Sequence, residues 1–319
     1  MTANTVLVVG DANVDLILQV DIVPRFGQAE QLLDGAELVL GSSAGIVASG
    51  LARLGVETTL LAVIGDDEFG RFTRSELEAA GVRTGALLTD AAVPTGISVI
   101  LSAPGDRSIL TLPGTIPLLT ADAVRAAVES VRPDHVHFAS YFLQPGLAGE
   151  LPELLSWLRG RGIRTSLDTN WDPAERWAGL ADVLPRLDIL LPNREELHAI
   201  AAAVGGTAGP GTAGRNDEAA ARSIAAFGPT VVVKTGADGG WSLGPDAPLV
   251  SSPGLVVDVV DTTGAGDSFD AGYLAAIAHG IGEESLRLRW AAVAGSLSTL
   301  AKGGTAGQPD RGELLGAIG

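Results

Sequence analysis

The sequence predicts an α/β protein built on a central, mostly parallel β-sheet with helices on both faces. Short apolar runs alternate with longer helical patterns along most of the 319 residues. Several of these runs are apolar on both faces, as buried parallel strands are. The repeated order of strand, helix and strand implies right-handed crossovers and a parallel sheet. The chain has no repeat of fixed period, and we expect one domain over residues 1–319.

The individual elements follow from the local pattern. Strand-like runs are expected at residues 5–9, 59–64, 135–138, 164–167, 188–191, 230–234 and 256–260. Helical patterns are expected at residues 46–54, 68–80, 121–131, 147–161, 194–204 and 269–278. Residues 205–214 are rich in glycine and predict a flexible loop between two helices.

Two regions interrupt this alternation. Residues 14–40 and 95–112 contain β-rich stretches, such as TGISVILS and SILTL, with few helical signals. They predict a small antiparallel sheet added to the main domain. A lid over a ligand cleft is one use for such a sheet, and a dimer surface is another.

Charge and cysteine content exclude several classes of protein. The formal net charge of −17 disfavours binding to nucleic acid, and the absence of cysteine excludes disulfides, thiolate metal sites and a cysteine nucleophile. No apolar run reaches the roughly 18 residues of a membrane span, and the start lacks a signal-peptide pattern. We therefore expect a soluble cytoplasmic protein. Because Lys234 and Lys302 are its only lysines, an anion has to be held by backbone amides, arginine or a metal ion.

The string DTTGAGDSFD, from Asp261 to Asp270, lies where a strand-like run gives way to a helical pattern. Small residues at Gly264, Ala265 and Gly266 let free backbone amides approach an anion, and the helix dipole favours negative charge there. Asp267 follows in the first turn. It is suited to accept the proton of an attacking hydroxyl, and a helix cap is the alternative.

This string resembles the C-terminal signature of the ribokinase-like (PfkB) carbohydrate kinase family, and further motifs extend the resemblance along nearly the whole chain. The resemblance implies a ribokinase-like fold with a small β-sheet lid. It makes Asp267 the catalytic base and gives the anion hole to Gly264, Ala265 and Gly266. It also implies a monovalent cation, such as K⁺, at Asp261 and Thr263.

Two N-terminal segments resemble the family's sugar-binding motifs. GDANVD would direct Asn13 and Asp15 to the substrate, and an ionised carboxylate suits sugar hydroxyls. A turn after the first strand is the alternative for Asp15. GSSAGIVASGLARLG matches the family's glycine-rich signature, but Ile46 stands where the family usually has an asparagine that touches the sugar. The residues of this segment expected beside the sugar are Gly41, Ser42 and Ser43.

Other candidate substrate residues have local alternatives. LDTNWDP resembles the Asp-x-Asn segment of several sugar kinases, so Asp168 and Asn170 are candidates, although helix capping before Pro173 explains them comparably. Asp172 stands where some relatives carry arginine. Arg107, in the expected lid, would reach over the substrate, and a plain turn is the alternative.

Nucleotide contacts are implied by three further matches. PNREE resembles an Asn-x-x-Glu motif in which Asn193 and Glu196 organise Mg²⁺ through its water shell, and a capped helix start is compatible with that role. VKTGADGG resembles the nucleotide loop. Ala292 stands in the last matching helix where many relatives have asparagine. The residues of the nucleotide loop expected near ATP are Lys234, Gly236 and Gly239.

Two further patterns are set aside. Residues 209–214 satisfy the dinucleotide string G-x-G-x-x-G, but they follow a helix rather than a strand. His135 and His137 share one face of a strand, as metal ligands do, but no third ligand accompanies them and we expect structural burial.

The sequence therefore predicts transfer of the γ-phosphoryl group of ATP to a hydroxyl of a sugar or sugar-like substrate, with Mg²⁺ as cofactor. A nucleoside kinase of the same fold is the alternative within the enzymes, and a non-catalytic sugar- or nucleotide-binding regulator is the alternative outside them. A nicotinamide-dependent dehydrogenase would rest on the misplaced glycine string alone. The resemblance also suggests a homodimer formed through the lid.

Overall fold

The computed structural model describes residues 4–19, 24, 26–27, 30–103, 106–205 and 216–319. Eight strands form the main sheet in the order β14-β13-β12-β11-β10-β9-β1-β4. The six strands from β12 to β4 are parallel, and β13 and β14 add an antiparallel edge. The strands are β1 (Val6–Val9), β4 (Thr58–Leu61), β9 (His135–Phe138), β10 (Arg164–Leu167), β11 (Ile189–Leu190), β12 (Thr230–Lys234), β13 (Gly240–Leu243) and β14 (Val250–Ser252).

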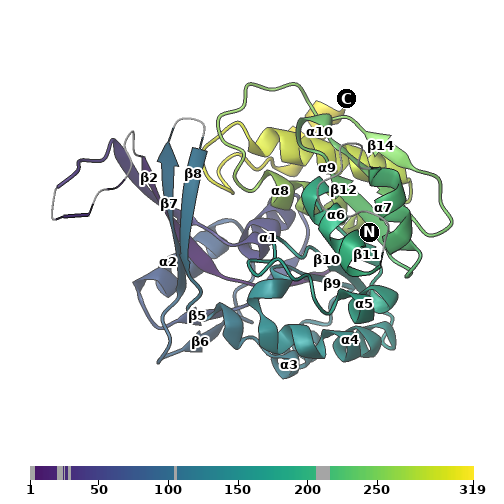
Figure 1. Ribbon diagram of the computed structural model, residues 1–319, viewed down its shortest axis with the longest axis horizontal. Coiled ribbons are helices and arrows are strands. Elements are labelled where there is room, and N and C mark those ends of the chain that lie inside the picture. Colours follow the sequence, from purple (N-terminus) through teal and green to yellow (C-terminus); the bar gives the residue numbers. More distant parts are fainter. Residues whose placement is uncertain (1–3, 20–23, 25, 28–29, 104–105, 206–215) are drawn as a thin grey trace.

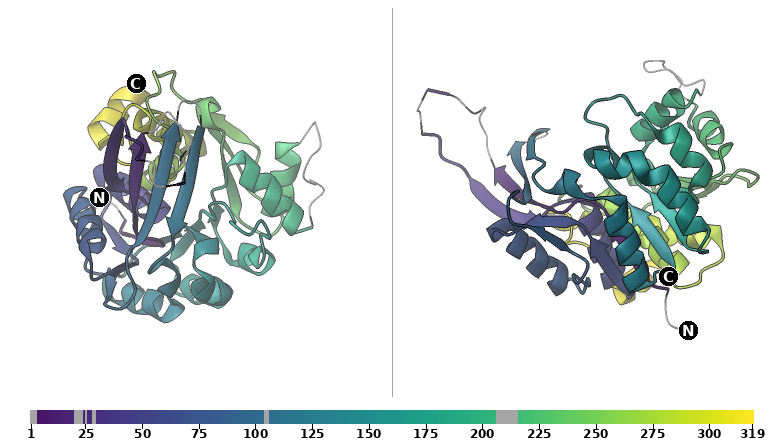
Figure 2. Two further views of the ribbon diagram at one scale, coloured as in Figure 1. Left: turned by 60° about the vertical axis from the view of Figure 1, so that its left-hand side comes forward. Right: turned by 90° about the horizontal axis from the view of Figure 1, so that it is seen from below.

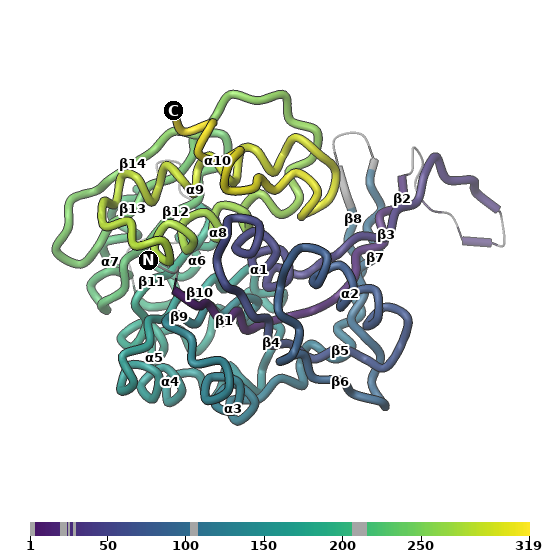
Figure 3. The backbone as a smooth tube through the Cα atoms, turned by 180° about the vertical axis from the view of Figure 1, so that it is seen from behind, coloured from purple at the N-terminus to yellow at the C-terminus, as the bar shows by residue number. Residues whose placement is uncertain are grey.

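Both faces of this sheet are buried, as its apolar strands predict. In β1, Val6 and Val8 belong to one hydrophobic core, whereas Leu7 and Val9 belong to another on the opposite face. Helices whose residues join the first core are α1 (Ser43–Arg53), α2 (Glu68–Ala79), α8 (Ala265–Ala278), α9 (Glu284–Ser298) and α10 (Arg311–Ile318). Helices whose residues join the second are α3 (Ala121–Val131), α4 (Pro145–Arg159), α5 (Leu180–Val183), α6 (Arg194–Ala203) and α7 (Asp217–Ala225). Viewed from behind, α1, α8 and α9 cover the first face (Figure 3).

A four-stranded sheet stands beside the main body (Figure 1) and extends away from it when seen from below (Figure 2). This lid has the order β3-β2-β7-β8, so the two expected regions do form one sheet. The expectation that it is antiparallel is wrong for its central pair, because β2 and β7 are parallel. Its outer pairs are antiparallel. The strands are β2 (Asn13–Gln19), β3 (Gly35–Leu40), β7 (Gly96–Ala103) and β8 (Asp106–Leu112).

Two predicted strands differ from the structure. The run at residues 59–64 is divided, since β4 ends at Leu61 and β5 (Val63–Gly65) pairs with β6 (Leu88–Asp90) in a separate two-stranded sheet. Residues 256–260 form no strand. Val256 and Val259 are exposed there, and the amide of Val260 donates to the carbonyl of Thr299 rather than to a neighbouring strand.

The predicted helices occur close to their expected bounds. The run at 121–131 is α3, whereas α1 begins three residues before its expected start because the Ser42 hydroxyl caps it by accepting from the amide of Gly45. Short 3₁₀ helices occur at Ile116–Leu118, Tyr141–Leu143, Leu184–Arg186 and Gly236–Asp238. The glycine-rich string at 209–214 lies outside the described residues. Among the described helices, none is long and apolar enough to span a membrane.

Candidate active site

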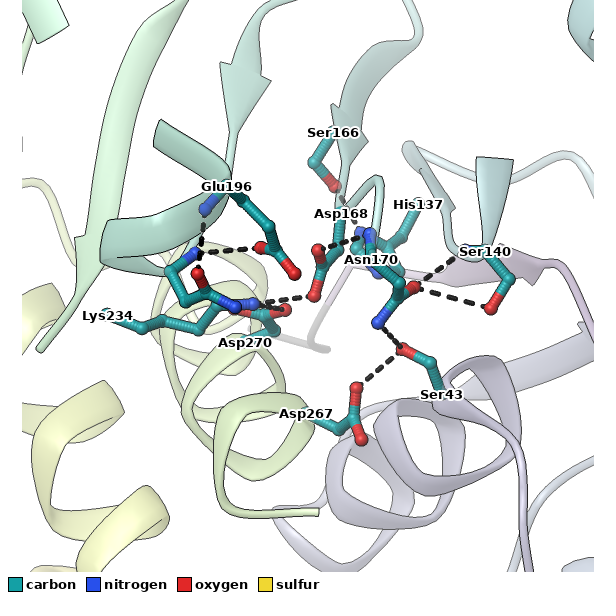
Figure 4. A network of polar contacts seen from close by, with 11 residues as sticks. Ser43, His137, Ser140, Ser166, Asp168, Asn170, Glu196, Lys234, Asp267 and Asp270 are labelled. Atoms are coloured by element: carbon teal, nitrogen blue, oxygen red, sulfur yellow. Dashed lines mark hydrogen bonds and ion pairs between the residues drawn. The ribbon is translucent and has the colours of Figure 1, made fainter. Parts of the chain in front are cut away.

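Polar side chains gather at the carboxyl ends of neighbouring strands of the main sheet, which is where open α/β sheets bind ligands. The first turn of α8 adds Asp267 from the far end of the chain (Figure 4). Segments distant in sequence therefore meet at one edge of the sheet. The residues that follow β1, β9, β10 and β11 or end β12 at this edge are Asp11, Ser140, Asp168, Asn170, Asn193, Glu196 and Lys234.

The predicted anion hole lies at the N-terminus of α8. Gly264 caps this helix with a left-handed φ of 70°, and a Cβ atom there would lie 2.7 Å from the Cα atom of Gly304. Only glycine fits this conformation and this contact. Within the described part of the chain the amides of Gly264 and Gly266 donate no backbone hydrogen bond, whereas the amide of Ala265 donates to the carbonyl of Thr262. The amides of Gly264 and Gly266 are thus available to an anion, whereas that of Ala265 is engaged.

Asp267 has the environment of a general base. The residue is partly buried, and this burial raises the pKa of its carboxyl group to about 7, with nearby Asp168 adding to the rise. Its Oδ1 atom accepts a hydrogen bond of 2.5 Å from the Ser43 hydroxyl. Its Oδ2 atom accepts none from the described residues. A base with a pKa near neutrality is suited to take a proton during catalysis at neutral pH.

Lys234, expected beside the nucleotide, ion-pairs with two buried carboxylates. Its Nζ atom lies 2.6 Å from Oδ2 of Asp168 and 3.1 Å from Oδ2 of Asp270. Burial opposes the charge on Lys234, but the two carboxylates outweigh it and raise the lysine pKa. Burial likewise raises the pKa of Asp270 well above its usual range. Sequence reasoning missed Asp270, although it lies one helical turn after Asp267 in the same motif.

Asn193 and Glu196 form the capping box of α6. The Glu196 amide donates to Oδ1 of Asn193, and the Asn193 amide donates to Oε2 of Glu196, each at 2.9 Å. Burial raises the pKa of Glu196 to about 7, and Asp168 adds to the rise. Its Oε1 atom accepts no hydrogen bond from the described residues, which leaves a carboxylate oxygen for the water shell of Mg²⁺.

Three of the expected sugar-binding residues, Asn13, Asp15 and Gly41, lie together at the base of the lid. Asn13 donates to Oδ1 of Asp15 at 3.0 Å, and a Cβ atom at position 41 would lie 2.3 Å from the same oxygen. Gly41 is thus the residue that lets the backbone approach this pair. Asp11, in the same GDANVD motif, was missed; its carboxylate accepts from the amides of Ser43 and Ala44 and so anchors the start of α1.

Ser43 and Asn170 meet beside the base rather than apart from it. The Asn170 side chain donates from Nδ2 to the Ser43 hydroxyl at 3.2 Å, and its Oδ1 atom accepts from the Ser140 amide at 2.8 Å. Asp168 accepts from the backbone amide of Asn170, which joins this contact to the lysine cluster (Figure 4). Ser140 was not predicted, because no local motif marks it.

Asp261 and Thr263 lie in the loop that leads to the anion hole. Oδ1 of Asp261 accepts from the amide and the hydroxyl of Thr263, and Oδ2 accepts from the amide of Gly303. Asp261 therefore ties this loop to the segment that follows α9. After β12, Gly236 and Gly239 form a tight turn with φ of 63° and 86°.

The positions that depart from the family pattern have structural explanations. The Asp172 carboxylate accepts from three amides, including those of Ala174 and Trp177, and so orders the loop after β10. Ile46 is buried and leaves no room for a Cβ atom on Gly304. Ala292 is buried within α9.

Arg107, the candidate substrate residue of the lid, belongs to β8, and its side chain lies outside the described residues.

His135 and His137 are buried as expected. Both imidazoles contact the Ser166 hydroxyl, at 2.7 and 2.8 Å, and burial lowers their pKa values to about 3 and 4. They are therefore neutral at physiological pH and contribute to the interior of the sheet.

An open parallel sheet, a smaller sheet beside it and a helix N-terminus with available amides next to a carboxylate form an arrangement suited to phosphoryl transfer. The family model described as pfkB family carbohydrate kinase matches residues 3–311, and the chain belongs to this family.

Individual relatives cover nearly all of both chains. The chain is 27% identical to a ribokinase of Bacillus subtilis over 312 residues, with 97% of each covered. It is 29% identical to a fructokinase of Vibrio alginolyticus over 333 aligned positions, with 99% of each covered. Its fold matches Arabidopsis thaliana ribokinase, solved with ribose and ATP, with a TM-score of 0.83, 23% identity and 99% of each chain covered.

Proposed function

We propose that this protein transfers the γ-phosphoryl group of ATP to a hydroxyl of a sugar or sugar-like molecule, with Asp267 as the base. The observation that carries the proposal is Asp267 in the first turn of α8, directly after the available amides of Gly264 and Gly266. A carboxylate next to an anion site repels phosphate, so its place there needs a chemical reason. Accepting the proton of an attacking hydroxyl supplies that reason.

The chain's residues divide the work. An alcohol is too weak an acid to be deprotonated in advance, so its proton passes to Asp267 as the new O–P bond forms and the bond to ADP breaks. The amides of Gly264 and Gly266 stabilise the charge on the moving group. Asn13, Asp15 and Gly41 are positioned to bind the acceptor's hydroxyls at the base of the lid.

Two ions enter the proposal through oxygen donors. Asn193 and Glu196 would hold Mg²⁺ through water, and the ion would neutralise charge on the phosphates. Asp261 and Thr263 bring a carboxylate and a hydroxyl together next to the anion hole, which suits K⁺. Activity measured in KCl and in choline chloride tests the second ion, and equal rates would remove it.

The lid also supports the proposed homodimer. Its outer strands β3 and β8 expose large apolar side chains, which are available for association with a second copy of the chain. Sedimentation at several protein concentrations tests this, and a monomer throughout would contradict it. The exposed side chains are Leu38, Ile109, Leu110 and Leu112.

We place the protein in the cytoplasm, consistent with its lack of cysteine.

A coupled ADP-release screen over sugars, sugar acids, polyols and nucleosides tests the function. We expect ATP-dependent turnover of at least one sugar-like acceptor, with Asp267→Asn as the inactive control. Turnover of nucleosides alone would favour a nucleoside kinase. ATP binding without turnover of any acceptor would favour a regulator instead.

A further inference from the structure

A hydrogen-bonded chain connects the end of strand β9 to the base. We propose that Ser43 and Asn170 are positioning residues that hold Oδ1 of Asp267 and leave Oδ2 to take the substrate's proton. The inference rests on the proposed function. The sequence predicted that Ser43 and Asn170 contact the sugar. Under this inference they hold Asp267 in position instead.

The donor and acceptor of each bond follow from one backbone amide. The Ser140 N–H group can only donate, so the atom of Asn170 that lies 2.8 Å from it is the oxygen Oδ1. The other amide atom, Nδ2, is then the one 3.2 Å from the Ser43 hydroxyl, and it too can only donate. Ser43 therefore accepts from Asn170 and has one proton left to donate.

That proton goes to the base. The Ser43 oxygen lies 2.5 Å from Oδ1 of Asp267, and an ionised carboxylate only accepts. A hydrogen bond to a charged acceptor is short and is stronger than a neutral one. One oxygen of Asp267 is thereby fixed, while Oδ2 keeps its lone pairs for the substrate and points away from Ser43 (Figure 4).

The backbone around this chain is held in conformations that L-residues adopt reluctantly. Ser42, Ser140 and Asn170 have φ values of 71°, 56° and 52°, and they are three of the six described residues other than glycine with positive φ. Such strain persists where the surroundings enforce it and gathers at functional sites. The Asp11 carboxylate accepts from the Ser43 amide at 3.3 Å and so fixes the Ser43 backbone as well.

The test is a set of four variants assayed with an acceptor found in the screen. Ser43→Ala removes the donor to Asp267, and Ser43→Thr keeps a hydroxyl. Asn170→Gly removes the amide side chain at a backbone conformation that glycine adopts freely. Ser223→Ala is the control, since it also removes a serine hydroxyl, one that donates to the carbonyl of Ala220 within α7.

We expect Ser43→Ala to lower kcat about tenfold or more, the size of one hydrogen bond to a charged group, with the acceptor KM within about threefold of wild type. Ser43→Thr should restore most of kcat, and Ser223→Ala should leave kcat within about twofold of wild type. Adding Asn170→Gly to Ser43→Ala should lower kcat by less than about threefold further, because the two residues act through one contact.

Two kinetic results would overturn the inference while leaving the kinase function intact. One is a rise in acceptor KM of about tenfold with kcat unchanged, which is the behaviour of a sugar contact. The other is unchanged kinetics in Ser43→Ala. Crystal structures supply a readout independent of turnover: the wild type should keep the contact between Ser43 and Asp267, and its absence would refute the positioning role. A wild type that turns over no acceptor would refute the proposed function instead.

Discussion

Replacing Lys234 by methionine should destabilise the protein by about 3–5 kcal/mol, because it leaves the buried Asp168 carboxylate without its counter-ion. The Lys234 side chain is 10% exposed and that of Asp270 is fully buried. At an effective dielectric constant of about 20, unit charges on Lys234 and Asp168 at the observed 2.6 Å attract by roughly 6 kcal/mol. The attraction of Asp270 is smaller, because burial raises its pKa and disfavours its charged form. Desolvation of the ions opposes this attraction by several kcal/mol. The expected loss of stability, about 3–5 kcal/mol, is therefore smaller than the attraction itself.

The loss should also depend on pH. Without the lysine, Asp168 and Asp270 must share a proton, so their pKa values in the folded state rise above those of the unfolded chain. Stability from a raised pKa is present at low pH and is lost as pH rises. The free energy of unfolding of Lys234→Met should therefore fall further below that of the wild type at pH 8.5 than at pH 5.5.

Equilibrium denaturation in urea at both pH values measures these differences. Arg222→Met is the control, since it breaks only the exposed pair between Arg222 and Glu218, for which we expect a loss of about 0.5 kcal/mol or less. A loss for Lys234→Met as small as that of the control, or one that shrinks at high pH, would refute the reasoning.

Two further predictions concern the base and the acceptor site. Burial raises the pKa of Asp267 to about 7, so kcat should fall as the pH drops through that value and the base becomes protonated; a kcat that stays level down to pH 5 would contradict this. Gly41→Ala would place a Cβ atom 2.3 Å from Oδ1 of Asp15 and 2.6 Å from Nδ2 of Asn13, so the acceptor KM should rise about tenfold while the KM for ATP stays within about twofold. Equal acceptor KM values in steady-state assays would show that the close approach at Gly41 is not needed.

The sequence predicts those helices and strands whose formation depends on the local pattern of residues. The bounds of α3 were predicted because Thr120 caps its start, accepting from the amide of Ala123, and because an amphipathic pattern fills it. The parallel pairing of β2 with β7 was not predicted, because the partner of a strand is not written in its own alternation of residues. The strand expected at residues 256–260 is absent for the same reason, since the run VVDVV does not by itself supply a neighbouring strand.

The site divides in the same way. Asp267 and the glycines before it could be proposed as one site because a single continuous motif holds them. Ser140 was not, because its role depends on a left-handed turn after β9 and on Asn170, which is thirty residues away. The partners of Lys234 were missed because Asp168 and Asp270 reach it from separate elements, β10 and α8, which only the folded sheet brings together.

The most direct test of the central claim is the turnover of Asp267→Asn with the acceptor found in the screen. The asparagine keeps the shape of the side chain but cannot take a proton, so kcat should fall at least about a hundredfold. ATP binding, measured by calorimetry, should stay within about threefold of wild type, because the amides at the start of α8 remain. Turnover near the wild-type rate would contradict the account and would remove Asp267 from the mechanism.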